Sequence, residues 1–288
     1  MAKITVGVPV YNSSSLLAEC LKCLVDQTFR DFEILIFDNA STDSTGDIAR
    51  EFATRDPRIK YHRQPQNIGM FPNFASVMDA CQTPYFCWRA YDDLSSLDWL
   101  ERLYEALEAN PSAQLAVARI ATSLDGAEPI LSYDLPKLTG NALIDIRNQL
   151  RHSNAACLYG LWRIETIKTI FHDVTSEYPT AWAGDHLMIF PILLNRSLVI
   201  VPEATFIVRD YSTVVRGYHR PKLQEMRELR RIYYRIALRH INALNLPWYQ
   251  KQIVKYYAWL QLGKAIFMFR RVVMQTLRKP IYKLLGKG

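Results

Sequence analysis

The chain has 288 residues, of which 49% are hydrophobic and 22% are charged. This composition can form a substantial core, and it excludes a disordered or fibrous protein. The first residues, MAKITVGVPV, lack a basic segment followed by a long apolar one, and no stretch reaches about 18 uninterrupted apolar residues. We therefore expect neither a signal peptide nor a membrane-spanning helix. We expect a cytoplasmic protein that is either cytosolic or attached peripherally to the inner face of the cell membrane.

The net charge of +7 is distributed unevenly along the chain. From residue 229 onward there are thirteen Lys and Arg and no Asp or Glu, whereas the part before it has 22 basic and 28 acidic residues, a net charge of −6. An acidic body with a basic, aromatic-rich end points to an anionic partner for that end, either membrane lipid or nucleic acid.

The five cysteines are odd in number and scattered, which argues against a disulfide framework and suits a reducing compartment. Cys20 and Cys23 form a C-x-x-C within the apolar helical pattern LLAECLKCLV, and no second pair lies at zinc spacing. We expect both side chains to pack in the core.

Short β-branched runs alternate with helical patterns over the first 120 residues, which predicts the α/β class with a βαβ sheet. Strands are expected at 4–10, 32–38, 58–62, 85–90 and 113–120, with helices between them at 14–27, 43–55, 71–81 and 97–109. Residues 121–160 look irregular, as loops or a hairpin. Helical patterns at 163–171 and 184–194, an extended run at 197–209, and two long helical patterns at 219–244 and 248–276 complete the chain. We expect the last two helices to pack on the body.

Three polar clusters follow predicted strands: PVYNSSS after the first, DNASTDST after the second and YDDL after the fourth. Ligands of open α/β sheets collect beyond the carboxyl ends of the strands, so these clusters predict the site. No G-x-G-x-x-G and no G-x-x-x-x-G-K-[ST] follows the first strand, and the body is acidic, so a bound diphosphate would need a metal ion to balance its charge. Mg²⁺ and Mn²⁺ prefer carboxylate and phosphate oxygens, which points to Asp92 and Asp93. The alternative is that one of them only caps the helix that begins near Leu97.

The sequence resembles the GT-A glycosyltransferases of family 2. The resemblance covers roughly the first 110 residues, through VGVPVYNSSSLLAECLKCLVDQTFRDFEILIFDNASTDST, NIGMFPNF and PYFCWRAYDDLSSLDWLERL in that order. It implies a GT-A nucleotide-binding mixed sheet flanked by helices, with a helical C-terminal extension. Residues 1–120 would form the nucleotide-sugar-binding half, 121–218 the acceptor-binding half of the same domain, and 219–288 a basic helical C-terminal region.

The same resemblance implies roles for four residues at the first two strand ends. Pro9 and Tyr11 would line the base pocket, and Asp38 with Asn39 would contact the base or the ribose. The family often has two adjacent aspartates where this chain has Asp38 and Asn39, and an amide offers a donor as well as an acceptor to a base edge. Both a uridine and a thymidine donor, linked as UDP- or dTDP-sugar, therefore stay open.

Two further motifs are similar to those of the family. Asp93 would be the ligand of Mn²⁺ or Mg²⁺, with Asp92 near the ribose or in the metal's surroundings. Asn67 and Gly69 would belong to the N-x-G loop near the sugar nucleotide. The alternative is that they form an ordinary turn.

The segment AWAGDHLMIF is similar to the family's short Glu-Asp motif, whose aspartate is the catalytic base. This implies Asp185 as the base, although Gly184 stands where the family usually has glutamate. Asp185 could instead cap the helix that follows, and His186 could be the base or a surface residue.

These features predict an inverting, metal-dependent glycosyltransferase of the hexosyltransferase type. It would move a sugar from a nucleoside-diphosphate donor to a glycan or lipid-linked acceptor in polysaccharide synthesis. An anionic membrane surface would suit its basic end, and an oligomer is compatible with the sequence. The alternative is a non-catalytic module that binds nucleotide-sugar or nucleic acid through the C-terminal helices. We expect no nucleic acid, since the C-terminal charges follow helical patterns rather than a nucleic-acid-binding motif.

Overall fold

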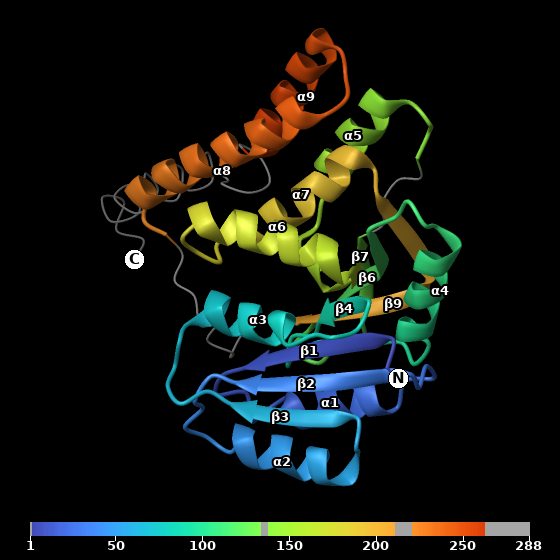
Figure 1. Cartoon of the computed structure of the whole chain (residues 1–288), viewed down its shortest axis with the longest axis vertical. Helices are drawn as coiled ribbons and strands as arrows, with labels where there is room; N and C mark the ends of the chain where they lie inside the picture. Colours follow the sequence, from blue (N-terminus) through green and yellow to red (C-terminus); the bar gives the residue numbers. More distant parts are fainter. Residues whose placement is uncertain (1, 134–137, 211–220, 263–288) are drawn as a thin grey trace, which may run out of the picture.

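The computed structural model of the chain describes residues 2–133, 138–210 and 221–262. One mixed sheet runs through both halves, with the strand order β3-β2-β1-β4-β8-β6-β9-β5 and β7 paired to β6 (Figure 1). The strands are β1 (Ile4–Val10), β2 (Phe32–Asp38), β3 (Ile59–Arg63), β4 (Tyr85–Trp88), β5 (Leu94–Ser95), β6 (Leu115–Leu124), β7 (Ile130–Tyr133), β8 (Leu161–Arg163) and β9 (Leu198–Asp210).

The strands β3, β2, β1 and β4 are parallel and form the predicted βαβ part. Alternate residues of β1 and β2 face opposite sides of the sheet, and both sides are covered, so all seven residues of β1 are buried. Because these strands are parallel, their carboxyl ends lie at one edge, where the three polar clusters were expected.

The second half of the sheet is mixed. β8 pairs antiparallel with both β4 and β6, while the long β9 runs parallel to β6. β5, which follows Asp93 directly, pairs with Phe206 and Ile207 near the end of β9. The segment that carries Asp92 and Asp93 is therefore fixed between the first half of the sheet and β9.

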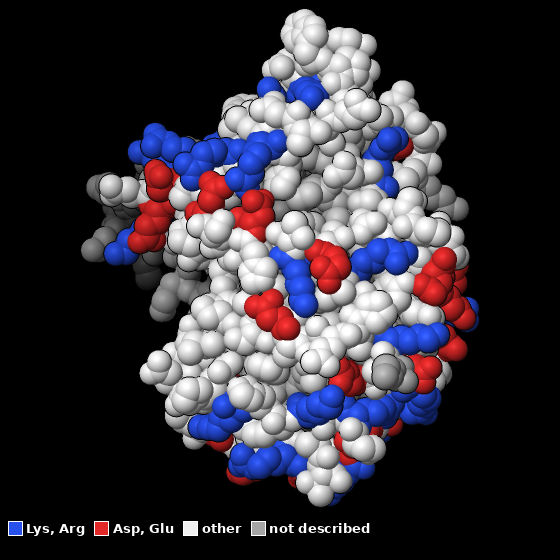
Figure 2. Space-filling view, in the orientation of Figure 1, with Lys and Arg blue, Asp and Glu red and all other residues white. Residues whose placement is uncertain are grey.

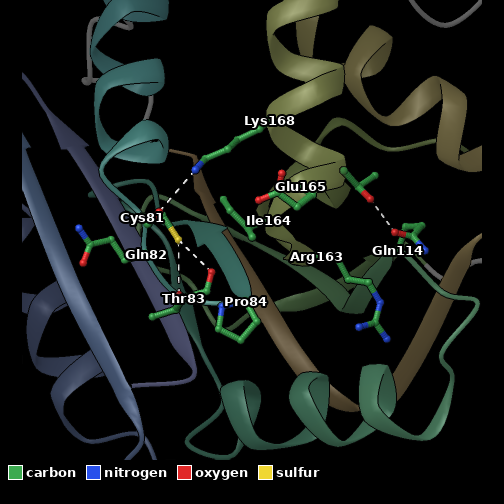
Figure 3. Close-up of a pocket in the computed structure, with 10 residues that line it drawn as sticks. Cys81, Gln82, Thr83, Pro84, Gln114, Arg163, Ile164, Glu165 and Lys168 are labelled. Atoms are coloured by element: carbon green, nitrogen blue, oxygen red, sulfur yellow. Dashed lines mark hydrogen bonds between the residues drawn. The ribbon is translucent and has the colours of Figure 1, made fainter. Parts of the chain in front are cut away.

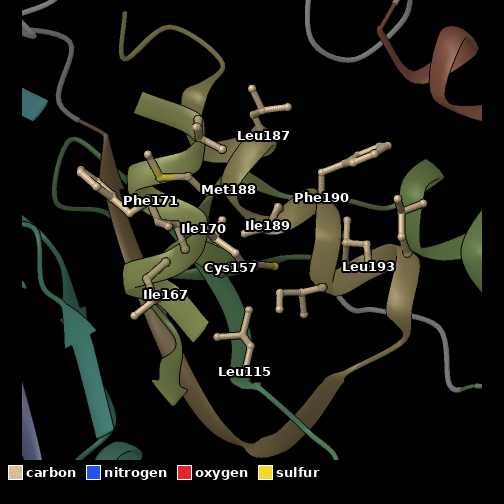
Figure 4. Close-up of a cluster of buried hydrophobic side chains, with 14 of the residues drawn as sticks. Leu115, Cys157, Ile167, Ile170, Phe171, Leu187, Met188, Ile189, Phe190 and Leu193 are labelled. Atoms are coloured by element: carbon tan, nitrogen blue, oxygen red, sulfur yellow. The ribbon is translucent and has the colours of Figure 1, made fainter. Parts of the chain in front are cut away.

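Helices cover both faces of this sheet. The helical segments are α1 (Leu17–Val25), α2 (Thr45–Arg55), α3 (Met70–Asp79), α4 (Trp99–Ala109), α5 (Ala142–Arg151), the 3-10 helix η1 (Ala155–Tyr159), α6 (Ile164–Glu177), α7 (Gly184–Asn195), α8 (Leu223–Ala243) and α9 (Trp248–Gln261). α1 and α4 share one apolar cluster, and α3, α5, α6, α7, α8 and α9 share the other. Figure 4 shows side chains of α6 and α7 meeting in the second cluster.

The expectation that the C-terminal helices pack on the body is confirmed for the described residues. α8 contacts α7, and α9 contacts α5, with Tyr233, Ile236 and Val254 buried. Arg235 and Arg239 of α8 form ion pairs with carboxylates of α6. Figure 2 shows blue and red side chains next to one another in the region where α8 runs over α6. The part of the predicted last helix beyond residue 262 lies outside the described residues.

The main differences from the sequence-based elements lie in the second half. Residues 121–160 include not only the predicted hairpin, β6 with β7, but also the unexpected helix α5. The short strands β5 and β8 were not predicted, and β4 ends at Trp88 rather than at residue 90. The division at residue 120 falls inside β6, so it separates proposed roles rather than independent folding units.

Candidate active site

The loops after β1 and β2 are held together by hydrogen bonds between polar side chains and backbone groups. Asn12, which has a left-handed backbone with φ 49°, accepts at Oδ1 from Thr42 N (2.8 Å), while its own N donates to Ser41 Oγ (2.9 Å). Ser13 N donates to Thr45 Oγ1 (2.7 Å). These bonds fix the backbone on either side of Tyr11, whose side chain is exposed, and Pro9 lies in β1 beside Phe37 of β2.

Asp38 is completely buried, and its carboxylate is already occupied by the fold. Its Oδ1 accepts from Ser41 N (2.8 Å), and its Oδ2 accepts from Tyr61 Oη (2.7 Å) and Arg63 Nη1 (2.8 Å). Burial, followed by the hydrogen bond to Asp38, raises the pKa of Tyr61 above its ordinary value, so Tyr61 keeps its proton and remains a donor. Contact of Asp38 with a nucleotide stays a prediction. Its observed contacts anchor the loop after β2.

Asn39 explains why this chain has an amide where the family often has a second aspartate. Its Nδ2 donates to Asn67 Oδ1 (2.9 Å) and to Gly69 O (3.2 Å), and its Oδ1 accepts from Ile68 N (2.8 Å). An aspartate could accept the third bond but could not donate the first two. Asn39 therefore fixes the N-x-G loop against the end of β2, and the structure brings these predicted donor residues to one edge.

Asp92 and Asp93 lie after β4 and are held by Arg209 at the end of β9. Arg209 N donates to Asp93 Oδ1 (3.1 Å), and its guanidinium contacts both the backbone oxygen of Asp92 and the carboxylate of Glu19 in α1. Asp93 is only 4% exposed. One arginine thus ties the Asp92–Asp93 turn to the neighbouring strand and to the first helix.

The environment of Asp93 disfavours its charge. Burial, followed by repulsion from Asp92, raises the pKa of Asp93 to about 7. The hydrogen bond from Arg209 N and the charges of Arg89 and Arg209 act in the opposite direction but do not cancel this effect. A buried carboxylate beside a second carboxylate is a site that gains from a divalent cation.

The donor set fits Mg²⁺ or Mn²⁺ bound through few protein ligands. Within the described residues, no three His, Cys, Asp or Glu side chains are grouped closely enough to hold a metal ion by themselves. Mg²⁺ is commonly bound by one or two carboxylates together with substrate phosphates and water. Asp93, with Asp92 beside it, can provide that share of the ligands.

Arg89 lies completely buried beneath this turn. Its guanidinium lies 4.4 Å from the ring centroid of Trp99 and 5.0 Å from that of Phe206, and Nη2 donates to Ser95 Oγ (2.9 Å). Its Nε and Nη1 find no hydrogen-bond acceptor among the described residues. The aromatic rings compensate part of the cost of this buried charge, and the charge favours ionised Asp93.

Asp185 lies in the first turn of α7. Gly184 is buried, and a Cβ at that position would lie 2.9 Å from Cζ of Phe71 in α3. α3 begins directly after Gly69, so the close contact of Gly184 with Phe71 places the start of α7 beside the N-x-G loop. A glutamate at position 184 would therefore require the ring of Phe71 to move. Asp92 and Asp93, by comparison, are held through Arg209 by contacts with β9 and α1.

The surroundings of Asp185 are a mixture of polar and apolar groups. The half-buried Asp185 accepts at Oδ1 from His186 N (2.7 Å). Burial lowers the pKa of His186 despite the nearby Asp185 charge, and its Nδ1 has no hydrogen-bond partner in the described part of the chain. Tyr178 donates to Trp182 O (2.8 Å), and burial raises its pKa. Ala183 holds the cap position of α7, but the bond from His186 N shows that Asp185 satisfies a backbone N–H of the first turn, so the predicted capping role and the catalytic one both stay predictions.

A hollow of about 660 Å³ opens at the opposite edge of the sheet (Figure 3). Its walls include Thr83 and Pro84 at the start of β4, and Arg163 of β8. The guanidinium of Arg163 already donates to three backbone or hydroxyl oxygens. Since ligands of α/β sheets bind at the carboxyl ends of the strands, this hollow is not the candidate site.

The sequence interpretation missed the residues that hold the site in place. Arg209 and Tyr61 are both on strands that reach the site only through the sheet pairing. The one local signal for Arg209 was its position as a cation at the end of an apolar run, FIVRD.

The comparisons with known proteins identify the class of this fold. The sequence profile of glycosyl transferase family 2 matches residues 5–174, more than half of the chain. The chain therefore belongs to glycosyl transferase family 2.

Curated relatives agree with this family. The glycosyltransferase GlyA of Streptococcus pneumoniae is 35% identical over 105 residues, 36% of this chain and 15% of the relative. EpsJ of Bacillus subtilis, an uncharacterized glycosyltransferase, is 27% identical over 164 residues, 56% of this chain and 46% of the relative. A GalNAc(5)-diNAcBac-PP-undecaprenol beta-1,3-glucosyltransferase of Campylobacter jejuni is 37% identical over 73 residues, 25% of this chain and 23% of the relative. The chain spans less than half the length of these relatives.

Solved structures support the predicted GT-A architecture. S. aureus TarS 1-349 in complex with UDP-GlcNAc matches 91% of this chain and 73% of its own, with TM-score 0.72 and 15% identity. The mannosyltransferase PcManGT of Pyrobaculum calidifontis, in complex with GDP-Man and Mn²⁺, matches 99% of this chain and 79% of its own, with TM-score 0.57 and 17% identity. At these identities the likeness concerns the fold alone.

Proposed function

We propose that this family 2 chain is an active, inverting, metal-dependent glycosyltransferase. The observation that carries the proposal is Asp93, a buried carboxylate with its pKa raised to about 7, beside Asp92 at the carboxyl edge of the sheet. Burial and mutual repulsion disfavour the charges of these two adjacent carboxylates. A bound cation with a diphosphate explains their position at the carboxyl edge of the sheet better than helix capping does. The non-catalytic alternative loses support from the family membership.

Asp93, with Asp92, would hold Mg²⁺ or Mn²⁺. When bound, the metal ion supplies positive charge that stabilises the nucleoside-diphosphate leaving group. Arg209 keeps both aspartates in place, and Arg89 favours the ionised form of Asp93. Both arginines are positioning residues in this proposal.

Asp185 would act as the catalytic base. It would take the proton from an acceptor hydroxyl as that oxygen attacks the anomeric carbon from the face opposite the leaving group, which inverts the configuration. Its place beside the N-x-G loop, through Gly184 and Phe71, supports this role. His186 is the second candidate, since burial lowers its pKa and favours the neutral imidazole that a base requires.

The donor would be a UDP- or dTDP-linked sugar, bound by the loops that carry Pro9, Tyr11, Asn39, Asn67 and Gly69. The UDP-GlcNAc complex of TarS supports a uridine nucleotide. The acceptor would be a glycan or a lipid-linked sugar, which the similarity to the GalNAc(5)-diNAcBac-PP-undecaprenol beta-1,3-glucosyltransferase supports. The enzyme would work in the cytoplasm at the inner face of the membrane. Within the described residues, every helix is too short or too polar to cross a bilayer.

A donor panel tests this proposal. Purified protein is mixed with UDP- and dTDP-sugars, with Mn²⁺ or with a chelator, and donor hydrolysis and thermal stabilisation are measured. A ligand at 100 times its Kd stabilises the native state by about 2.7 kcal/mol, so the true donor should raise the melting temperature and be hydrolysed only with metal. Equal effects for all donors, or metal-independent hydrolysis, would contradict it.

A further inference from the structure

The outer surface of α9 exposes a set of aromatic side chains. Trp248, Tyr256 and Trp259 are 75%, 57% and 50% exposed, and Tyr249 and Ile253 on the same helix are exposed as well. In the remainder of the described chain, Tyr11 is the only other aromatic among the exposed large hydrophobic residues. A soluble helix rarely presents so many aromatic rings to water without a partner.

These residues share one face of the helix. At 100° per residue, Trp248, Trp259, Tyr256, Tyr249 and Ile253 fall within about 140° of the helix circumference. The rings of Tyr256 and Trp259 are stacked, with centroids 6.4 Å apart. The opposite face, with Val254, Ala258 and Gln261 buried, packs on the body. We call the five exposed residues the aromatic face of α9.

The helix that carries the aromatic face has cations and no carboxylate. α9 contains Lys251 and Lys255 and no carboxylate, and the guanidinium of Arg230 lies 6.0 Å from the ring centroid of Trp259. The sequence that follows, 263–288, adds seven Lys and Arg and no Asp or Glu. By contrast, Arg235 and Arg239 of α8 are neutralised by Asp173 and Glu177 of α6.

We propose that the aromatic face of α9 lies in the interface of an anionic bilayer, with Lys251, Lys255 and Arg230 on the lipid phosphates. Trp and Tyr favour the bilayer interface, where the ring meets apolar chains and its polar atom meets water or headgroups. An amphipathic helix that carries cations binds anionic lipid in the plane of the surface. The hairpin of α8 and α9 extends from the end of the molecule away from β1, β2 and β3, where it can reach such a surface (Figure 1). Charge complementarity favours lipid over a second copy, because the same basic region would face itself in a symmetric dimer.

This inference rests on the proposed function only for its biological setting, a lipid-linked acceptor, and it is tested without donor or acceptor. The full chain is floated with phosphatidylcholine vesicles that either contain or lack phosphatidylglycerol. We expect binding only to the anionic vesicles, a decrease with added salt, and a blue shift of tryptophan emission on binding. The double variant Trp248→Ala/Trp259→Ala should bind the anionic vesicles at least about tenfold more weakly than the unmodified chain.

Leu97→Ala is the matched control, because Leu97 is also exposed, at 58%, but lies in the nucleotide-binding half. It should bind vesicles like the unmodified chain. Since all substituted side chains are exposed, unchanged thermal unfolding would show that the variants are folded. Equal binding to neutral vesicles, or undiminished binding of the tryptophan variant, would overturn the proposal. The proposal would also be overturned if sedimentation without vesicles showed a dimer and the tryptophan variant disrupted that dimer. Metal-dependent donor hydrolysis by the tryptophan variant would show that the active site survives whether or not docking fails.

Discussion

Asn39 provides a direct test of how a single residue holds the N-x-G loop at the carboxyl edge of the sheet. Asn39→Asp would place a carboxylate against two acceptors, Asn67 Oδ1 and Gly69 O, while keeping the bond from Ile68 N. Leaving buried polar groups unpaired costs about 1–3 kcal/mol, so we expect a loss of unfolding free energy of that size and weaker nucleotide binding. Urea unfolding and calorimetry measure the two effects. Asn39→Ala, which loses the bonds without adding charge, is the control and should be milder in nucleotide binding.

Asp93 is the residue on which the proposed metal dependence rests. Asp93→Ala should abolish transfer and remove the Mn²⁺-dependent part of nucleotide binding. The fold should survive, because Asp93 follows the end of β4 rather than lying inside the strand. Asp92→Ala should be milder. Calorimetry with the nucleotide, with and without Mn²⁺, is the measurement, and an unchanged metal effect in the Asp93 variant would show that this assignment is wrong.

Substitution of Asp185 should lower turnover and leave donor binding nearly intact. Removal of a general base typically costs about a hundredfold to ten-thousandfold in rate. We therefore expect Asp185→Asn to show this loss in kcat, while the amide still accepts the bond from His186 N and keeps the first turn of α7 in place. Steady-state kinetics and nucleotide titration separate the two quantities. Near-normal turnover would move the base elsewhere, and His186→Gln would be the next variant.

At the scale of elements, α7 is placed by the closeness of Gly184 to Phe71. Gly184→Glu, the residue common in the family, should destabilise the protein and lower activity, because a Cβ would lie 2.9 Å from the ring of Phe71. Overpacking of this kind costs about 1–3 kcal/mol. Adding Phe71→Ala to Gly184→Glu should recover part of that stability, since Phe71→Ala removes the obstructing ring. Thermal unfolding of the double variant and of both single variants decides it, and additive losses would refute the steric explanation.

The long elements were predictable from the sequence because their periodicity extends over several residues. β1 and β2 occupy the predicted ranges, and the rule that ligands collect at strand ends located Asp38, Asn39 and Asp93 at one edge. β5 has two residues and β8 three, which is too short for any pattern to appear. They exist only through pairing with distant strands. α5 carried a local signal in its cap residue Asn141, whose side chain accepts from two backbone N–H groups, but it stands in a segment with the irregular composition of a loop.

The contacts that complete the site were not predictable from local sequence. Arg209 reaches Asp92 and Asp93 across more than a hundred residues, through the register of β9 beside β5. The role of Asn39 depends on which groups of the N-x-G loop face it, which needs coordinates. Sequence therefore identifies residues with suitable chemistry, and the strand pairing decides how they are held.

At the scale of the whole molecule, one sheet links the parts to which donor and acceptor roles were assigned. β4 carries the aspartate turn, β9 holds that turn through Arg209, and α7 covers the same sheet with Asp185 in its first turn. Because the groups lie on elements of one packed body, a change in the charge of Asp93 should appear in the stability of the entire fold.

That coupling predicts how stability changes with pH in metal-free protein. Asp93 has a folded-state pKa of about 7 against an ordinary value of 3.8. Below about pH 4 the carboxyl is protonated in both states and contributes no difference. As the pH rises from about 4 to 7, the unfolded chain releases this proton while the folded chain retains it, so the unfolding free energy falls. Above about pH 7 the loss levels off at roughly 4 kcal/mol as an upper bound.

Asp93→Asn removes the titrating group but keeps an oxygen that can accept from Arg209 N. We therefore expect the variant and the unmodified protein to be similarly stable near pH 4, and the variant to be more stable at pH 8. Urea unfolding in the presence of a chelator, at intervals across this range, measures the difference. A difference that stays constant with pH, or that favours the unmodified protein at pH 8, would mean that Asp93 is not disfavoured as an anion. Mn²⁺ with nucleotide should stabilise the unmodified protein more than the variant at pH 8, because the bound cation compensates the charge that the fold alone does not.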